Sequence, residues 1–304
     1  MNSAKTLIVI AGPTAIGKTA AAIQLAQHFN TVILSADSRQ FYKEMFIGTA
    51  KPSVDELAAA QHYFIDSHSV SEPFSVGDFE KQALALLDEL FKIHHVVILV
   101  GGSGLYIKAV CDGFDNIPVA DKGIRERLNL ELEEKELAYL LEKLKIADPD
   151  YFAEVDINNP QRVIRALEVF ESTGNPFSSY RVANTNTRPF NIIKIALDMP
   201  RELLYDRINQ RVDKMVEEGL LDEVRSLISY RQFNALNTVG YSEIFDYLDG
   251  KIKLDTAIEK IKQNTRRFAK RQLTWFRKDK DFHWFEANED LYGNSLAYLL
   301  QQLQ

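Results

Sequence analysis

The sequence is poor in cysteine and in long apolar runs. It has one cysteine in 304 residues, which excludes a disulfide within the chain and a zinc site built from several cysteines. No apolar run approaches the 18 residues that a membrane-spanning helix requires. Residues 1–5 lead directly into an apolar segment, without the charged-then-apolar pattern of a secretory signal. We therefore expect a cytoplasmic protein that does not enter a membrane.

An excess of positive charge is also missing. The 36 lysines and arginines are outnumbered by 43 aspartates and glutamates, so the net charge is −7. A nucleic-acid partner would have to be met by local basic patches, because the field of the whole protein opposes it. The length allows one large α/β domain with an insertion, or two modest domains.

The most informative segment is a glycine-rich loop that satisfies G-x-x-x-x-G-K-[ST]. Its residues are Gly12, Pro13, Thr14, Ala15, Ile16, Gly17, Lys18 and Thr19. An apolar run at 7–10 predicts a buried strand before it, and alanine-rich residues 20–27 predict a helix after it. In this context the loop N–H groups and the helix N-terminus point at an anion, Lys18 adds positive charge, and Thr19 can hold Mg²⁺. We predict a bound diphosphate or triphosphate; a plain glycine turn is the alternative.

Further apolar runs and helical spacings predict the fold class. Residues 31–35, 96–100 and 192–197 read as buried strands and 63–66 as a short one, with helical segments such as 78–92 between them. This alternation predicts an α/β fold with a P-loop NTPase-like core, in which helices cover a parallel sheet.

An insertion is predicted where the composition changes. After residue 113 the chain becomes charged and helical over 121–156. An asparagine-capped helix follows from 158, and then a polar loop over 172–190. We expect a core formed by residues 1–114 and 190–304, and a helical insertion domain over 115–189.

Polar residues follow two of the predicted strands. Asp37 comes after the second strand, and Gly101, Gly102, Ser103 and Gly104 come after the third. Parallel strands bring these positions to one edge of the sheet. The third strand lacks the acidic residue that holds Mg²⁺ in P-loop NTPases, and its glycines suggest that a ligand lies close to the backbone. Asp37 is either catalytic, a helix cap or part of a metal site; Ser103 is either functional or a turn hydroxyl.

One predicted helix, residues 201–218, carries a basic face. Arg207, Arg211 and Lys214 share it at i, i+4 and i+7. Such a face is usually solvated, unless it turns toward the phosphate loop.

A second predicted helix, residues 255–276, is more basic still. Ile261, Phe268 and Trp275 recur every seven residues and predict its buried face. The cations around them are Arg266, Arg267, Lys270, Arg271, Arg277 and Lys278. The helix is either an ordinary surface helix or, given this excess in an acidic protein, a site for a polyanion.

In their order along the chain, these motifs resemble the bacterial tRNA dimethylallyltransferases. The resemblance rests on segments 12–19, 37–40, 47–52, 101–106, 159–168, 239–241 and 269–275, and extends to about residue 285. It implies transfer of a dimethylallyl group from its diphosphate to N6 of the adenosine 3′ to the anticodon of a tRNA. It also implies a monomer that uses Mg²⁺. Ile16 and Ser103 depart from the serine and threonine common at these positions of the family.

The resemblance also implies roles for individual residues. The phosphate loop binds the prenyl diphosphate, Lys18 and Arg211 stabilise it as it leaves, and Thr19 holds the metal. Asp37 and Ser103 hold the target base, with Asp37 acting as the base or as a Mg²⁺ ligand. The residues expected to contact tRNA are Asp37, Ser38, Arg39, Gln40, Ser103, Arg125, Gln161, Arg162, Val163, Ile164, Arg165, Lys270 and Arg271.

Two other functions are compatible with parts of the pattern. A small-molecule kinase would bind ATP on the same loop, but the missing acid after the third strand and the basic C-terminal helix count against it. A non-catalytic RNA-binding protein would keep the loop for structure alone.

Overall fold

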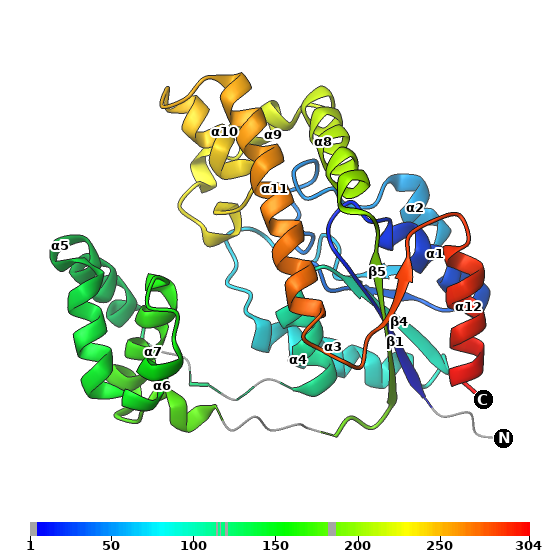
Figure 1. Cartoon of the computed structure of the whole chain (residues 1–304), viewed down its shortest axis with the longest axis horizontal. Helices are drawn as coiled ribbons and strands as arrows, with labels where there is room; N and C mark the ends of the chain where they lie inside the picture. The colour runs from blue at the N-terminus through cyan, green and yellow to red at the C-terminus, as the bar shows by residue number, and fades with distance from the viewer. Residues whose placement is uncertain (1–4, 114, 116, 119–120, 182–186) are drawn as a thin grey trace. The chain divides into compact units, whose positions relative to one another are not determined.

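The computed structural model describes residues 5–113, 115, 117–118, 121–181 and 187–304. These residues form two compact units (Figure 1). The core unit comprises Met1–Cys111 and Thr187–Gln304, and the insertion unit comprises Asp112–Asn186. The insertion therefore begins at residue 112 rather than the predicted 115, and ends at 186 rather than 189.

The core unit is built on a parallel sheet. Its strands are β1 (Thr6–Ala11), β2 (Ile33–Ser35), β3 (His62–Tyr63), β4 (Val96–Gly101), β5 (Asn191–Asp198) and β6 (His283–Glu286). They lie in the order β3-β2-β4-β1-β5-β6, and every pairing is parallel. All residues of β1 are buried, as the apolar run predicted. The carboxyl ends of β1, β2 and β4 therefore meet at one edge of the sheet.

Helices account for most of the remaining core unit. They are α1 (Lys18–Phe29), α2 (Val54–Ala59), α3 (Val76–Leu90), α4 (Gly104–Asp112), α8 (Arg201–Glu217), α9 (Leu220–Ser226), α10 (Tyr241–Leu248), α11 (Leu254–Phe276) and α12 (Leu291–Gln302). Short 3₁₀ helices span Ile228–Tyr230 and Asn234–Leu236.

Both faces of the sheet are covered, because successive side chains of a strand point to opposite sides. Leu7 and Val9 of β1 pack with α3 and α4, whereas Ile8 and Ile10 pack with α1, α8 and α12 (Figure 1). Burying each such side chain contributes about 1.5–3 kcal/mol. A separate cluster joins α8, α9, α10 and α11 to Tyr42 and Met45, which follow β2. The predicted α/β class is confirmed.

The insertion unit is helical and has its own core. Its helices are α5 (Lys122–Ala147), α6 (Pro149–Glu154), α7 (Pro160–Thr173) and a 3₁₀ turn (Phe177–Tyr180). Leu128, Leu140 and Val163 are fully buried within it. Glu136 interrupts α5 with a φ of 63°. Asn159 caps α7 by accepting a hydrogen bond from the N–H of Arg162, as the sequence predicted.

Two predictions of local structure are wrong. The short strand expected over 63–66 ends at Tyr63, because Phe64 and Asp66 take left-handed backbone angles, with φ of 62° and 52°. On α11 only Ile261 of the three predicted core residues is buried; Phe268 and Trp275 are 38% and 40% exposed. The buried side chains of this helix are those of Ala257, Ile261, Ala269, Gln272 and Phe276.

The reason lies in the size of the packing residues on α11. The buried positions are spaced by whole helical turns, but two of them are alanines, which a search for large apolar residues overlooks. Small side chains let neighbouring elements approach this face of the helix closely, while Phe268 and Trp275 lie beside it and stay partly exposed.

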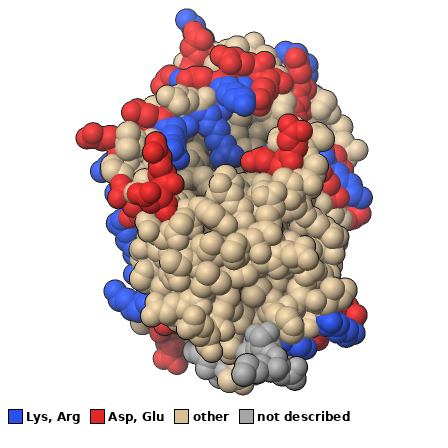
Figure 2. Space-filling model, turned by 90° about the vertical axis from the view of Figure 1, so that its right-hand side faces the viewer, with Lys and Arg blue, Asp and Glu red and all other residues tan. Residues whose placement is uncertain are grey.

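Charge is distributed unevenly over the core unit. Helix α12 contains no charged residue, and α1 contains none after Lys18. Figure 2 shows the side of the molecule that carries α12: a broad uncharged area, with charged side chains of both signs gathered around a hollow above it. Among the described residues, no helix is long and apolar enough to cross a membrane.

Candidate active site

The phosphate loop connects β1 to α1 through unusual backbone angles. Ala15 and Gly17 have φ values of 63° and 102°. The value at Gly17 is one that residues with a side chain rarely adopt, so glycine is required directly before α1. Lys18 is the first residue of α1, and its Nζ donates a hydrogen bond to the carbonyl oxygen of Pro13 at 2.7 Å. The lysine therefore lies over the loop that it follows.

Lys18 is placed between a carboxylate and a guanidinium. Burial lowers its pKa from 10.5 to about 8, the nearby charge of Asp37 raises it, and that of Arg211 lowers it further. The end of β2 and helix α8 thus both deliver a charged side chain to the phosphate loop.

Arg211 reaches the loop from the middle of α8. Its Nη1 donates to Thr14 Oγ1 and its Nη2 to the carbonyl oxygen of Ala50, each at 3.3 Å. Burial lowers the pKa of the guanidinium, an effect that Asp37 opposes. The other two residues of the predicted basic face do not line the cavity that Arg211 lines. Arg207 lines two other cavities, one of them together with Ile16 and Gly17, and Lys214 is exposed beside Glu218 at 3.5 Å.

A cavity of about 200 Å³ opens beside these charges. Its polar lining includes Thr14, Asp37, Ser38, Ser103 and Arg211. Its apolar lining comes from Ile208, Val212, Met215, Val239, Ile261 and Phe268. The cavity therefore offers positive charge, a carboxylate, hydroxyl groups and an apolar wall to one ligand.

The residues after β2 and β4 meet at one edge of the sheet, as predicted from their positions at the ends of parallel strands. Ser103 Oγ accepts a hydrogen bond from the N–H of Ser38 at 3.0 Å and lies 3.2 Å from Ser38 Oγ. Asp37 Oδ1 accepts from the N–H of Arg39 at 3.0 Å. These bonds hold the Asp37 carboxylate and the Ser103 hydroxyl at the cavity wall.

Gln272, on α11, is a site residue that the sequence did not reveal. Its buried side chain accepts from the N–H of Thr14 at 2.9 Å and donates to the carbonyl oxygen of Gly102 at 2.9 Å. It therefore joins the phosphate loop to the end of β4. Gln272 lies within segment 269–275 of the resemblance, but no role was predicted for it, because a single glutamine in a basic helix gives no sign of its partners.

This contact corrects the interpretation of the glycines after the third strand. A Cβ atom on Gly102 would lie 2.2 Å from Gln272 Nε2, and one on Gly101 would lie 2.4 Å from the carbonyl oxygen of Ala36. Protein atoms therefore approach both glycines closely: the backbone after β2 meets Gly101, and a side chain of α11 meets Gly102.

Glu223 of α9 is the second residue that the sequence did not reveal. Its carboxylate accepts hydrogen bonds from three successive N–H groups, those of Phe46, Ile47 and Gly48, at 3.0, 2.6 and 3.0 Å. Tyr241 Oη also donates to it at 2.7 Å, and burial together with the Glu223 charge raises the pKa of this tyrosine strongly. Glu223 thus fixes the loop that supplies part of the cavity wall.

Gln40 and Arg39, both predicted to bind tRNA, lie at the same rim. Gln40 Nε2 donates to the carbonyl oxygens of Ala50 and Thr49 at 3.1 and 3.4 Å, and its Oε1 accepts from Ser35 Oγ at 3.1 Å. The side chain of Gln40 is therefore engaged in holding the loop. Arg39 lines the cavity.

In the insertion unit, the predicted arginines differ in their surroundings. Arg125 pairs with Glu168 at 2.7 Å, and Arg165 lies 3.5 Å from the same carboxylate. Arg162 and Gln161 are exposed on α7. The charge of Glu168 partly offsets Arg125 and Arg165, which leaves Arg162 as the more available cation.

Two predicted tRNA contacts in this unit are corrected. Val163 and Ile164 are 0% exposed and belong to the core of the insertion unit. They are the apolar residues through which α7 packs, so their side chains do not reach RNA.

Thr19 and Asp37 are the residues whose oxygen atoms would hold the expected Mg²⁺. Thr19 lies in the first turn of α1, and Asp37 is close enough to act on the charge of Lys18. Within the described ranges, no group of three or more histidine, cysteine or acidic residues is arranged to hold a metal. Mg²⁺ commonly uses one or two protein ligands together with water and substrate phosphates, which matches this sparse donor set.

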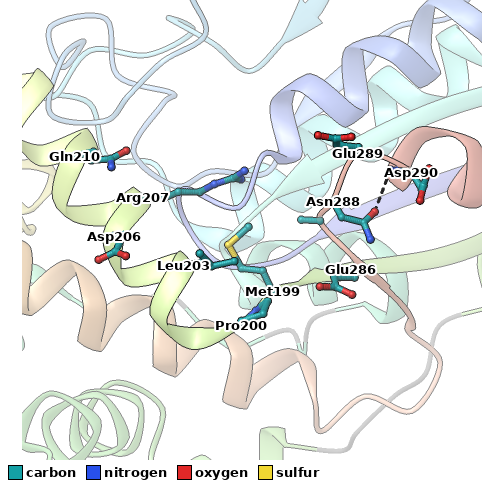
Figure 3. Close-up of a pocket in the computed structure, with 11 residues that line it drawn as sticks. Met199, Pro200, Leu203, Asp206, Arg207, Gln210, Glu286, Asn288, Glu289 and Asp290 are labelled. Carbon is teal, nitrogen blue, oxygen red and sulfur yellow. Dashed lines mark hydrogen bonds between the residues drawn. The ribbon is translucent and has the colours of Figure 1, made fainter.

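A larger cavity, about 640 Å³, lies between the start of α8 and the segment after β6 (Figure 3). Four carboxylates line it, from Asp206, Glu286, Glu289 and Asp290, and Arg207 extends into it from α8. A diphosphate would meet a net negative charge there. The smaller cavity beside the phosphate loop is therefore the candidate active site.

Known proteins of one family are similar to this chain over nearly its whole length. The model of the IPP transferase family matches residues 40–279. A tRNA dimethylallyltransferase of Christiangramia forsetii is 56% identical over 93% of this chain and 94% of its own. One from Bacteroides fragilis is 47% identical over 98% of both chains.

Solved structures of transferases from the same family are also similar to this chain. The tRNA isopentenylpyrophosphate transferase of Bacillus halodurans superposes with a TM-score of 0.73 at 39% identity, covering 98% of this chain and 96% of that one. A eukaryotic dimethylallyltransferase acting on tRNA gives a TM-score of 0.79 at 27% identity, covering 98% and 79%.

Proposed function

This chain belongs to the IPP transferase family of tRNA dimethylallyltransferases, and from this premise we propose how its active site works. The enzyme transfers a dimethylallyl group from dimethylallyl diphosphate to N6 of the adenosine that follows the anticodon of a tRNA. The observation that carries the proposal is the cavity in which Arg211 and Asp37 face an apolar wall, with Lys18 close enough to feel the charge of both.

The phosphate loop binds the diphosphate. When the allylic C–O bond breaks, the bonding electron pair and its negative charge move to the leaving diphosphate. The loop N–H groups, Lys18 and Arg211 stabilise this charge, and because the hydrogen bonds to Thr14, Ala50 and Pro13 hold the cations in place, little reorganisation is needed. Mg²⁺ held by Thr19 would supply further positive charge when bound.

The apolar wall accommodates the dimethylallyl group. Its residues come from α8, α11 and the segment before α10. They give a small branched hydrocarbon a surface that water does not occupy, and so place its reactive carbon beside the polar side of the same cavity.

Asp37 receives the proton. The exocyclic amine of adenine attacks the allylic carbon, a new N–C bond forms, and the nitrogen must lose a proton as it does so. The Asp37 carboxylate lines the cavity and orients the amine before accepting this proton. Ser103 offers a hydroxyl to the same base.

The target adenine has to leave the stack of the anticodon loop to enter this cavity. Exposed cations bind the surrounding RNA backbone: Lys270 and Arg271 on α11, and Arg162 in the insertion unit. One chain supplies all of these groups, so we propose a monomeric, cytoplasmic enzyme.

Competition binding tests the ligand of the loop. Dimethylallyl diphosphate should protect the enzyme against thermal unfolding and should not be displaced by ATP at equal concentration. Binding of ATP with full displacement of the prenyl diphosphate would instead support a kinase.

A further inference from the structure

The second half of α11 bears a shallow groove of about 420 Å³, outside the cavity described above. It is lined by Arg267, Lys270, Arg271, Thr274, Trp275 and Lys278. Lys270 and Arg271 are expected to contact tRNA, and Arg267 and Lys278 belong to the same basic helix, for which a polyanion is one of the two expectations. The exposed tryptophan is the residue of the groove that has no expected role.

The charge of the groove has one sign. Among the described residues that line it, four are cationic and none is acidic. None of the four cations forms a salt bridge with a residue that the structure describes. By contrast, two cations that lie on α11 or directly follow it, outside the groove, are paired: Lys262 with Asp213 and Arg277 with Asp198, both at 2.7 Å. The groove thus concentrates unneutralised positive charge in a protein whose net charge is −7.

Trp275 lies at the border between this groove and the active site. A Cβ atom on Gly104 would lie 2.1 Å from Trp275 Cδ1, so the indole rests against the backbone directly after Ser103. Ser103 lines the catalytic cavity, and so does Phe268, which precedes Trp275 by seven residues on α11. Arg271 lies between them in sequence, 5.7 Å from the Phe268 ring. An aromatic and cationic strip therefore runs along α11 from the cavity.

An indole that is 40% exposed fits single-stranded RNA when it lies beside four cations that form no salt bridge with a described residue. Every base has a flat π surface that stacks on an aromatic ring whatever its sequence, and the flanking phosphates require positive charge. A purely apolar partner would leave the four cations desolvated without counter-charges.

We propose that Trp275 is a stacking platform for an unpaired base next to the adenosine that enters the cavity. Arg267, Lys270 and Lys278 hold the adjoining phosphates. This inference rests on the proposed function, since it takes the RNA substrate from it. The groove then has a positioning role, because the stacked neighbour keeps the loop open while the target base is turned out.

The two tryptophans of the chain allow a direct test. Trp284 lies on β6 and does not line the groove, so Trp284→Phe leaves Trp275 as the only indole. This variant is titrated with an anticodon stem-loop RNA, and its fluorescence is recorded. Stacking of a base on Trp275 quenches the emission, whereas dimethylallyl diphosphate alone does not. If the emission is unchanged when the RNA is bound, the proposal is wrong. This test leaves Trp275 itself unsubstituted.

Substitution gives the second readout. Trp275→Ala should weaken RNA binding by about 5- to 140-fold, the range that loss of one stacked base predicts, and Trp275→Phe should restore most of it. Trp275→Leu, which is apolar but has no π surface, should behave like the alanine variant. If the leucine and phenylalanine variants bind RNA equally well, Trp275 contributes only by packing and the stacking proposal is wrong.

Salt dependence separates the indole from the cations. Neutralising Lys270 and Arg271 should lower the slope of log K against log salt by about one unit for each lost phosphate contact, whereas Trp275→Ala should leave the slope unchanged. Lys262→Gln, on the same helix but outside the groove, is the matched control.

Failure of this inference can be told from failure of the proposed function. If the Trp284→Phe enzyme transfers the dimethylallyl group but RNA leaves Trp275 emission unaltered, only the stacking platform is wrong. If no RNA binds and no transfer occurs, both are wrong.

Discussion

Arg211 Nη1 lies 3.3 Å from Thr14 Oγ1, although 197 residues separate the two in the sequence. The contact exists because β5 pairs directly with β1, so the helix that follows β5 passes beside the loop that follows β1. A guanidinium from the far half of the core unit thereby becomes part of a phosphate site begun by the first strand.

Removing either cation at this site should cripple turnover. Lys18→Ala and Arg211→Ala each withdraw positive charge from the leaving diphosphate, and loss of such a donor costs about 2–4 kcal/mol of transition-state stabilisation. Steady-state kinetics of transfer measure the loss. Lys214→Ala, which removes an exposed cation of α8 beside Glu218, is the control and should retain activity. A normal kcat/KM in the Arg211 variant would show that Arg211 does not stabilise the leaving diphosphate.

The pH dependence of dimethylallyl diphosphate use should follow Lys18. Its pKa in the free enzyme is lowered to about 8, so the ammonium loses its proton, and with it the charge that attracts the diphosphate, above that pH. The rate constant kcat/KM should therefore fall above about pH 8, since this parameter reports the free enzyme. A bound diphosphate favours the charged lysine, so the same limb in kcat should lie at higher pH. A kcat/KM that stays flat up to about pH 10, the range of an ordinary lysine, would contradict this.

Glu223 should contribute to stability through the loop at residues 46–48. Glu223→Ala leaves three N–H donors and the Tyr241 hydroxyl without their acceptor, which should lower the free energy of unfolding by about 1–3 kcal/mol in a urea titration. Glu223→Gln keeps an acceptor oxygen and should lose less. The neighbouring Asp222, which pairs with Arg225 at the surface, is the control: Asp222→Ala should change stability by no more than about 0.5 kcal/mol. If the two alanine variants change the free energy of unfolding equally, Glu223 does not stabilise the loop in this way.

Asp37→Asn separates the two roles that the sequence left open for this residue. The substitution keeps the shape of the side chain and removes its basicity. If Asp37 accepts the amine proton, binding of RNA and of diphosphate should survive while kcat falls roughly 10²–10⁴-fold, without rescue by added Mg²⁺. Recovery of activity at high Mg²⁺ would assign the residue to the metal.

The sequence was sufficient for those features that depend on local order. The phosphate loop, its flanking strand and helix, and the meeting of residues 38 and 103 at one sheet edge all follow from short segments and from the parallel-strand rule. Each needs only neighbouring residues or one general principle of α/β sheets.

Features that depend on how distant segments pack could not be derived in this way. Arg207 and Arg211 share a helical face by spacing, yet only Arg211 reaches Thr14, because the placement of α8 on the sheet decides which turn faces the loop. Gln272 bonds to a residue 258 positions away, and its residue type gives no hint of that partner. Trp275 was assigned to the core because large apolar residues are usually buried, whereas an alanine, Ala269, performs the packing.

Transfer of the dimethylallyl group is measured by mixing the enzyme with dimethylallyl diphosphate labelled in its hydrocarbon part, Mg²⁺ and an unmodified anticodon stem-loop RNA. The label should appear in the RNA, on N6 of the adenosine 3′ to the anticodon, and nuclease digestion followed by mass spectrometry locates it. The same RNA with guanosine at that position should remain unlabelled. Retention of all label in the diphosphate, under conditions where both substrates bind, would contradict the account.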